Sequence, residues 1–556
     1  CVNTRTSSQQ VQFLPWSFVV DGLWTRNATS LAWEPVKVRQ LRIYESYTHT
    51  GQNYFSYLIL GRDMVAIAFN YSSSDSYRQF LAVRQCPVYS FKGSEAIVPD
   101  EYASMLGIKK RSRKIKYEPS PFCFDYQGDI SRIAIAKRKY AIFADCGLGK
   151  TIMLLEYAQH AAKATGKRVL IVSPLMVCKQ TIEEAARWYG MNIGRIPANN
   201  LEHWLNGDEE YHCQIGVTNY ESIREGLFQS KLGALILDES SMLKSHYGAW
   251  GTRLIELGRG LEWKLCATGT PAPNDRIEFA NHAVFLDRAK TVNEFLASYF
   301  INRGETQNRW ELKPHALKPF YRNLADWSIF LTNPATYGWK DNVGVTPPIY
   351  VHIDHIELTD DQRKAAQDLT GRLITTSVGG LGERGKLSQI AKGKGGIATN
   401  KPAFIRSLVD SWPDESTIIW CHYNDEQESM ERAFPEAVSI SGDTPEDKRQ
   451  AGIEAFKCGS AKVLISKPKI LGFGLNLQIC TRQIFSGLKD SYEEYYQAVK
   501  RSNRIGSTKP LNVHIPVTEL EMPFVENVLR KASRVEADTR EQEELFKEVG
   551  HACIQR

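Results

Sequence analysis

Short apolar runs alternate with helix-like stretches along much of the chain, and this alternation is the main guide to its fold. The block that begins near residue 120 contains five apolar runs of strand length, "YAIFAD", "RVLIVSP", "CQIGVTN", "ALILDE" and "KLCATGT". A second block begins at Ile418, with "TIIWCHYN", "AVSISG", "KVLISKPK", "RQIFSG" and "LNVHIPV". Apolar strands separated by helices are typical of a parallel sheet covered on both faces. The pattern therefore predicts an α/β protein with two parallel-sheet lobes in tandem.

The remaining segments have other patterns. Aromatic and β-branched runs near the N-terminal end predict a small β-rich region, whereas "IEFANHAVFL", "VNEFLASYF" and "LKPFYRNLADWSIFL" predict helices inserted between the lobes. The charged tail is helix-like, and we expect it to brace the second lobe in preference to binding a partner. The expected parts are a β-rich region at 1–107, a basic linker at 108–119, a first lobe at 120–274, a helical protrusion with its linker at 275–400, a second lobe at 401–518 and a helical brace at 519–556.

Composition and charge narrow the class of protein. The 556 residues exceed what one core accommodates, and no run of about 18 apolar residues could span a bilayer. Eleven cysteines without a CxxC pair, together with the lack of a signal-peptide pattern, predict a cytoplasmic protein with no membrane partner. The net charge of +6 permits a polyanion partner. The basic stretch "KKRSRKIK" at 109–116 fits a solvated linker and a nucleic-acid contact equally well.

The stretch "FADCGLGKT" has the spacing of a phosphate-binding loop, although Ala144 stands where the consensus has its first glycine. It lies between an apolar run and the helical pattern "IMLLEYAQHAA", which is the context that such a loop requires. Backbone N–H groups around Gly147 and Gly149 can surround phosphate oxygens, and Lys150 can neutralise the terminal phosphates of ATP. The Thr151 hydroxyl can hold Mg²⁺.

A pair of acids follows another predicted strand, in "ALILDESS". Asp238 and Glu239 come directly after an apolar run, 88 residues beyond Lys150. The carboxyl end of a buried strand is where open α/β sheets bind ligands. We expect Asp238 to hold Mg²⁺, and Glu239 to orient and deprotonate the attacking water.

These motifs continue into the second block. With them, residues from about 120 to 550 resemble a helicase superfamily two ATPase of the Swi/Snf type. The chain is similar to the compact Snf-like enzymes of bacteriophages and prophages. In the first lobe, "FDYQGDI" resembles the adenine-reading segment, "VSPLMV" and "VTNYES" resemble motifs that touch a nucleic-acid backbone, and "CATGTPAPN" resembles the coupling motif. The residues nominated by this resemblance are Gln127 for adenine, Ser173, Pro174, Thr218 and Tyr220 for nucleic acid, and Thr268, Gly269 and Thr270 for coupling.

The second lobe adds "LGFGLNLQ", which nominates Gly474 for coupling, and "QAVKRSNRIGSTKP". This last motif nominates Gln497 for coupling and Arg501 and Arg504 as arginine fingers, which lie one helical turn apart on one face. The chain departs from the family at three positions, which leaves the usual contacts there unassigned. These are Ser240 and Ser241 after the acids and Ser507 after the final "RIG".

The resemblance implies two RecA-like lobes that use ATP and Mg²⁺ and grip the backbone of double-stranded DNA. We expect a translocase of a bacterial or phage-infected cell that moves along duplex DNA without robust unwinding. Two alternatives stay open. One is an RNA or branched-DNA helicase, and the other is a DNA-binding scaffold that uses ATP as a clamp and recruits a nuclease or methyltransferase.

Four further side chains have a structural and a functional interpretation. Trp188, Trp263 and Trp420 could stack on bases, but each adjoins a predicted buried element, and core packing is favoured. For His422, a satisfied residue at a strand end and a nucleic-acid contact are equally consistent with the sequence.

Overall fold

A computed structural model describes residues 24–26, 33–35, 43–46, 55–59, 64–69, 74–86, 89–99, 106, 116–207, 213–227, 229–243, 249–304, 310–340, 347–370, 381–471, 476–489, 491–504 and 507–554. The chain divides into two compact units, residues 1–113 and 114–556, which are described separately. Most of the basic stretch at 109–116 lies outside the described residues.

The first unit is β-rich, as the sequence predicts; its main sheet is antiparallel, and it also contains a helix that was not expected. In its described part the strand order is β3-β4-β5-β7-β6, and α1 packs against β7. Val65, Val83 and Val98 are buried between the helix and the sheet. The elements are β1 (Trp24–Arg26), β2 (Trp33–Pro35), β3 (Ile43–Ser46), β4 (Phe55–Ile59), β5 (Met64–Ala68), α1 (Ser74–Gln85), β6 (Ser90–Lys92) and β7 (Glu95–Pro99).

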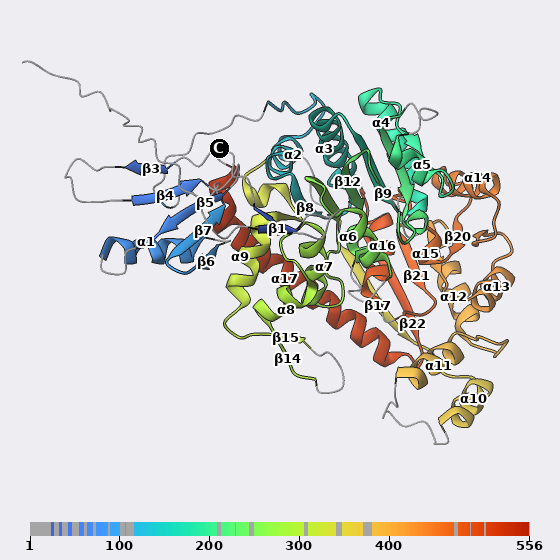
Figure 1. Cartoon of the computed structure of the whole chain (residues 1–556). Helices are drawn as coiled ribbons and strands as arrows, with labels where there is room; N and C mark the ends of the chain where they lie inside the picture. The colour runs from blue at the N-terminus through green and yellow to red at the C-terminus, as the bar shows by residue number, and fades with distance from the viewer. Residues whose placement is uncertain are drawn as a thin grey trace, which may run out of the picture. The chain divides into compact units, whose positions relative to one another are not determined.

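The first sheet of the second unit is parallel throughout, and its order within the described residues is β10-β11-β9-β12-β13-β8-β16 (Figure 1). The strands are β8 (Lys139–Ala144), β9 (Arg168–Ser173), β10 (Gly194–Arg195), β11 (Ile215–Asn219), β12 (Leu232–Asp238), β13 (Trp263–Thr268) and β16 (Ser328–Leu331). Alternate residues belong to different core clusters: Phe143 packs with one and Ile142 with the other. The sheet is therefore buried on both faces, which explains why most residues of its central strands are apolar.

The helices of this lobe cover both faces of the sheet. They are α2 (Asp125–Lys137), α3 (Lys150–Thr165), α4 (Leu175–Tyr189), α5 (Leu201–Asn206), α6 (Ala249–Leu257), α7 (Phe279–Phe285), α8 (Val292–Tyr299) and α9 (Leu317–Trp327). A hairpin of β14 (Phe300–Asn302) and β15 (Trp310–Leu312) follows α8. Trp204, Trp327 and Phe320 are among the fully buried side chains of one core cluster.

The run "LKPFYRNLADWSIFL" is not a single helix, which corrects the expectation for this segment. The helix α9 ends at Trp327, and Ser328–Leu331 continues as β16, which pairs with β8. The change follows from the sequence "SIFL", which packs all four residues into the core at the sheet edge. The segment expected to form the protrusion therefore contributes a strand to the first sheet.

The second sheet is also parallel, with the order β17-β22-β21-β18-β20-β19 in the part that is described. Its strands are β17 (Ile349–His355), β18 (Thr417–Trp420), β19 (Val438–Ile440), β20 (Val463–Ser466), β21 (Arg482–Phe485) and β22 (Leu511–Val517). The five predicted strands are present, and β17 is an additional edge strand. The helices are α10 (Asp360–Thr370), α11 (Leu381–Ala391), α12 (Lys401–Asp410), α13 (Asn424–Ala433), α14 (Glu446–Lys457), α15 (Pro468–Leu471) and α16 (Tyr492–Ser502).

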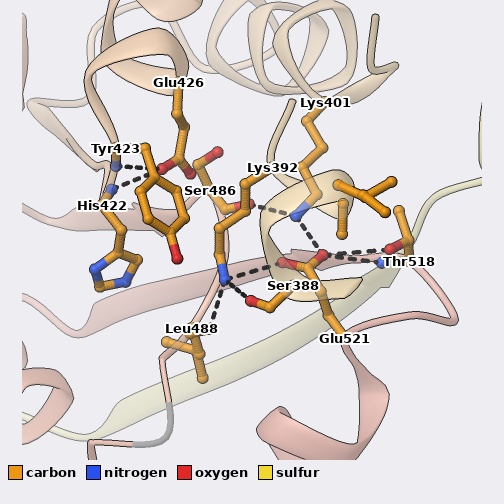
Figure 2. A network of polar contacts seen from close by, with 12 residues as sticks. Ser388, Lys392, Lys401, His422, Tyr423, Glu426, Ser486, Leu488, Thr518 and Glu521 are labelled. Carbon is orange, nitrogen blue, oxygen red and sulfur yellow. Dashed lines mark hydrogen bonds and ion pairs between the residues drawn. The ribbon is translucent and has the colours of Figure 1, made fainter. Parts of the chain in front are cut away.

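A buried polar network attaches the linker segment to this second sheet (Figure 2). The Glu521 carboxylate accepts a hydrogen bond from Lys401 at 2.5 Å and lies 3.5 Å from the Lys392 amine. Lys392 also donates to the backbone oxygen of Leu488 at 2.8 Å. Gly487 makes this approach possible, because a Cβ there would lie 2.3 Å from the Lys392 side chain. Both lysines and Glu521 are almost completely buried, so each charge depends on the others.

The C-terminal helix α17 (Met522–Ile554) packs on both lobes, whereas the sequence led us to expect a brace for the second alone (Figure 1). Val528 belongs to the core of the second lobe and Leu545 to the core of the first. Between them, Asp538 accepts a hydrogen bond from Arg276 Nε at 3.1 Å. One helix thus contributes to both hydrophobic cores.

Burial confirms two of the three tryptophan predictions. Trp420 and Trp263 are buried, but Trp188 is 43% exposed and does not lie in the core. It lies near the end of α4, where its ring packs on Phe122 and the Arg187 guanidinium lies over it. Along the described residues, no helix is both long and apolar enough to cross a membrane.

Candidate functional site

Four neighbouring strands of the first sheet end at the same edge and carry the predicted motifs. In the order β9, β12, β13 and β8, they end at Ser173, Asp238, Thr268 and the start of the phosphate loop. The carboxyl ends of parallel strands form the ligand-binding edge of such sheets. The acids and the coupling residues therefore lie beside the loop that precedes Lys150.

The phosphate loop joins β8 to α3, and two glycines give it its shape. The φ angles of Gly147 and Gly149 are 90° and 73°, in the left-handed region that favours glycine. The helix α3 begins at Lys150, so its first N–H groups face the loop. The Lys150 amine donates to the backbone oxygens of Ala144 at 2.9 Å and Asp145 at 3.2 Å. The amine is therefore held against the backbone at the start of the loop.

Gln127 packs directly on this loop from α2. Its amide Nε2 donates to the Leu148 backbone oxygen at 3.3 Å, and its Oε1 accepts from the Phe124 backbone N–H at 3.0 Å. A Cβ added at Gly149 would lie 2.2 Å from Gln127 Nε2. The glycine is thus needed for the close approach as well as for the backbone conformation.

The two acids have different surroundings. Asp238 is buried, and its carboxylate accepts hydrogen bonds from the Ser173 hydroxyl at 3.0 Å and the Glu239 N–H at 3.1 Å. Burial and the charge of Glu239 raise the pKa of Asp238 to about 7, although Ser173 and Lys150 act in the opposite direction. Glu239 is partly exposed and has a φ of 51°, an uncommon conformation for a residue other than glycine.

The coupling residues contact both the second acid and the phosphate loop. The Thr268 hydroxyl donates to Glu239 Oε2 at 3.2 Å and accepts from the Thr270 N–H at 3.2 Å. A Cβ at Gly269 would lie 3.3 Å from the Ala144 backbone oxygen. The segment therefore links the carboxylate to the loop through direct contacts.

Three of the four expected nucleic-acid contacts are buried and have partners within the lobe. Ser173 binds Asp238, the Thr218 hydroxyl donates to the Ile196 backbone oxygen at 2.9 Å, and the Tyr220 hydroxyl donates to the Asp238 backbone oxygen at 2.6 Å. Contact with nucleic acid through these side chains would require them to leave the core. The structure instead brings Ser173 and Tyr220 to the first acid. Pro174 is half-buried, at the N-terminus of α4.

Ser240, one of the three positions at which this chain departs from the family that it resembles, has a partner that the sequence does not indicate. Its hydroxyl lies 3.1 Å from Nε2 of His282, a buried residue of α7. Burial lowers the pKa of His282 to about 4, so the ring is neutral at pH 7. Ser241 donates to the Glu239 backbone oxygen at 3.4 Å. Ser240 and Ser241, which follow the two acids, thus both form hydrogen bonds within the first lobe.

The last motif lies on α16 and in the turn that follows it. Arg501 lies on the helix but Arg504 lies beyond its end at Ser502, which corrects the expectation that both share one helical face. Ser491 caps the helix by accepting a hydrogen bond from the Glu494 N–H at 3.3 Å. Gln497 donates to Glu493 within the helix at 3.4 Å, and Arg501 is buried. Gly474, predicted from the preceding motif, lies outside the described residues.

The helix α16 also contacts the phosphate loop, which sequence reasoning missed. The Lys500 amine lies 2.9 Å from Asp145 Oδ2, and the Tyr496 hydroxyl donates to Asp145 Oδ1. Burial would raise the pKa of Asp145, but Lys500 and Tyr496 together keep it below its usual value. Burial lowers the pKa of Arg504. The neighbouring Arg501 also lowers it, whereas Cys146 of the loop raises it, so Arg504 lies near both residues. The arginine-bearing end of α16 therefore faces the loop.

The residues present fit ATP and Mg²⁺. Lys150 and the N–H groups at the start of α3 suit phosphate oxygens. The raised pKa of Asp238 next to Glu239 indicates a site where a divalent cation would offset both burial and repulsion. The hydroxyl of Thr151 lies one residue beyond Lys150, in a half-buried position.

Comparisons with known proteins identify the family. The description "SNF2-related domain" matches residues 88–382, more than half of the chain, and "Helicase conserved C-terminal domain" matches residues 400–506. A relative from Drosophila melanogaster, "SWI/SNF-related matrix-associated actin-dependent regulator of chromatin subfamily A-like protein 1", is 24% identical over 408 residues, which are 69% of this chain and 51% of the relative. The chain thus spans about half the length of that protein.

Among solved structures, "Sulfolobus solfataricus SWI2/SNF2 ATPase core in complex with dsDNA" is 19% identical, and the match covers 78% of this chain and 98% of that chain with a TM-score of 0.36. The family match extends from the end of the first unit through the first sheet. The helicase match covers α12 to α16 of the second lobe. The chain belongs to the SNF2-related family, the Swi/Snf-type ATPases of helicase superfamily two.

Proposed function

We propose that the chain hydrolyses ATP in response to double-stranded DNA and uses the energy to move along the duplex. The observation that carries this proposal is the meeting of two lobes at one loop. Lys150 and the two acids lie at the edge of the first sheet, and α16 brings Arg501 and Arg504 from the second lobe toward the same loop. A composite site of this kind couples hydrolysis to lobe closure.

On the first lobe, each residue has a chemical role that its contacts support. Lys150 binds the terminal phosphates, and Asp238 and Thr151 hold the cation. Thr268 donates to Oε2 of Glu239, which fixes the carboxylate and leaves Oε1 to accept the proton of the attacking water. Mg²⁺, when bound, neutralises part of the phosphate charge.

On the second lobe, Arg501 and Arg504 supply positive charge to the γ-phosphate as the lobes close. Arginine fingers contribute about 10³ to 10⁵ in rate in related phosphoryl-transfer systems. Gln497 and Gly474 belong to the same coupling apparatus in this proposal. Loss of the γ-phosphate removes the ligand that holds the lobes together, so hydrolysis releases the closed state.

We propose double-stranded DNA as the track because the chain belongs to the SNF2-related family and because of the names of two similar proteins. The Drosophila relative is named as a regulator of chromatin, and the archaeal core is described as a complex with duplex DNA. Binding through phosphates is independent of sequence and weakens by roughly 0.7 to 0.9 logarithmic units per decade of salt for each phosphate neutralised. Pro174 is the nominated contact that remains at least partly accessible.

The steady-state ATPase rate with duplex DNA, single-stranded DNA, RNA or no nucleic acid tests the proposal. Glu239→Gln is expected to reduce the DNA-stimulated kcat by about 10² to 10⁴, because the general base is lost. Glu225→Gln is the matched control, since this acid is exposed elsewhere on the same lobe. A triplex-displacement assay then tests movement along the duplex.

The pattern of stimulation separates the alternatives. Stimulation by RNA or forked DNA alone would replace the translocase with a helicase acting on those substrates. ATP binding without hydrolysis in the wild type would favour an ATP-clamped scaffold for a nuclease or methyltransferase. Equal ATPase rates in the wild type and Glu239→Gln would show that Glu239 is not the general base, and the proposed mechanism would then be wrong.

A further inference from the structure

Three side chains on one face of α16 form a continuous row. Tyr492, Tyr496 and Lys500 are spaced four residues apart, so they lie one above the other along the helix. The rings of Tyr492 and Tyr496 are 5.6 Å apart, and the Lys500 amine lies 5.5 Å from the centre of the Tyr496 ring. The three side chains therefore pack on one another along the helix.

The partner of this row is Asp145, the first residue of the phosphate loop. Lys500 lies 2.9 Å from Oδ2, while Tyr496 and the Cys146 N–H both donate to Oδ1. The Asp145 N–H donates to the Leu331 backbone oxygen at 2.9 Å, which fixes the residue at the edge of the sheet. Both carboxylate oxygens of Asp145 thus have partners on α16, and Oδ1 also accepts a hydrogen bond from the backbone of the loop.

The contact between Lys500 and Asp145 is shielded from water, which strengthens the ion pair. The Lys500 and Asp145 side chains are 20% and 19% exposed. Burial lowers the pKa of Lys500, but Asp145 more than compensates and raises it overall, so the pair is fully charged near neutral pH. A partly buried, hydrogen-bonded ion pair is stronger than the exposed pairs on the surface of the chain.

The row adjoins the two arginines assigned above. Lys500 directly precedes Arg501, and Arg504 lies in the turn after the helix, near Cys146 of the loop. Docking of Lys500 on Asp145 therefore fixes the distance between the loop and both guanidinium groups. A helix held only by its apolar face could rotate or slide by a residue and misplace them.

Resting on the proposed ATPase function, we propose that Lys500 and Tyr496 are positioning residues. They dock α16 on Asp145 of the phosphate loop and thereby align Arg501 and Arg504 with the γ-phosphate. Neither residue touches the reacting atoms. Their removal should slow the chemical step and leave ATP binding to the first lobe intact.

DNA-stimulated ATP hydrolysis by the full chain provides the first test. Lys500→Met is expected to lower kcat about tenfold, with less than a twofold change in KM for ATP, and Lys500→Arg to restore most of the rate because it keeps the charge. Combining Asp145→Asn with Lys500→Met should cost little more than either change alone, since both remove one contact. Lys469→Met is the control, because this exposed lysine of α15 forms only a loose ion pair with Glu494 of α16, with 4.0 Å between the charged atoms.

The native thiol of Cys146 supplies a readout that does not depend on hydrolysis. Its rate of labelling by a maleimide without nucleotide, measured by peptide mass spectrometry, should rise about tenfold in Lys500→Met. The exposed Cys458 serves as an internal reference. Loss of a nearby positive charge alone slows thiolate chemistry, so faster labelling reports undocking of α16.

The two readouts separate failure of this inference from failure of the proposed function. A wild type without DNA-stimulated hydrolysis, but with faster Cys146 labelling in Lys500→Met, would overturn the proposed function and retain the docking contact. Unchanged kcat and unchanged labelling in Lys500→Met, in a wild type that hydrolyses ATP, would overturn the inference. A rise in KM with unchanged kcat would also overturn it, because the residues would then act on ATP binding.

Discussion

Asp238→Asn is expected to stabilise the folded protein while it abolishes ATP hydrolysis. Asp238 is 5% exposed at the end of β12, and burial together with the charge of Glu239 raises its pKa from 3.8 to about 7. The folded protein therefore holds this proton at pH values where the unfolded chain has released it. Asparagine has nearly the same shape as the protonated acid and carries no charge at any pH.

The sign and size of the effect follow from the two pKa values. A raised carboxyl pKa lowers the free energy of unfolding as pH rises from about 4 to about 7, because the folded state must then bury the charge. At about 1.4 kcal/mol per pH unit, the full penalty above pH 7 is about 4 kcal/mol. The advantage of asparagine should therefore grow by about 3 kcal/mol between pH 5 and pH 8.

Urea unfolding at pH 5 and pH 8, without nucleotide or Mg²⁺, measures this difference. Asp287→Asn is the matched control: burial would raise its pKa, but Lys139 and Lys264 lower it overall, so this substitution should destabilise the protein at pH 8. Asp287 has a φ of 56°, which asparagine tolerates well. An advantage of Asp238→Asn that is equal at both pH values, or absent, would refute the reasoning.

Two further substitutions test the loop and the buried network. Gly149→Ala should raise KM for ATP at least tenfold, because its Cβ would displace the Gln127 amide and strain the backbone, and an unchanged KM would contradict the assigned cradle. Glu521→Gln should lower the free energy of unfolding by about 3 to 5 kcal/mol, because Lys392 and Lys401 lose the carboxylate that they share in the interior. Urea unfolding with an unchanged midpoint would show that the network is not a source of stability.

Much of the fold was predictable because burial determines the sequence of the central strands. The strand residues "ALIL" of β12 and "VLI" of β20 are apolar and buried, since both faces of each sheet are covered. Two edge strands, β16 and β17, were missed, for different reasons. Most residues of β17 are exposed or half-exposed, so its sequence "IYVHIDH" lacks the apolar run, and β16 follows a helix without a turn residue between them.

The candidate site was predictable where its residues are close together in the sequence. Gly149 and Lys150 lie within one turn, and Asp238 directly precedes Glu239, so spacing and flanking strands were sufficient. Pairs formed by distant side chains leave no such pattern. Asp145 and Lys500 are 355 residues apart, and nothing in either segment identifies the other as its partner.

Two of the links between the lobes differ in how easily they can break, and this difference constrains the motion. The Asp145 contact consists of polar groups that water can replace when α16 leaves the loop. In contrast, α17 buries Val528 in one core and Leu545 in the other, and neither can be exposed without losing about 1.5 to 3 kcal/mol of hydrophobic stabilisation. Opening should therefore separate α16 from the phosphate loop while α17 keeps both ends packed, so the helix becomes the axis about which the lobes move. In the proposed mechanism, this arrangement would let the lobes release the products of ATP hydrolysis in every cycle and still return Arg501 and Arg504 to the same loop.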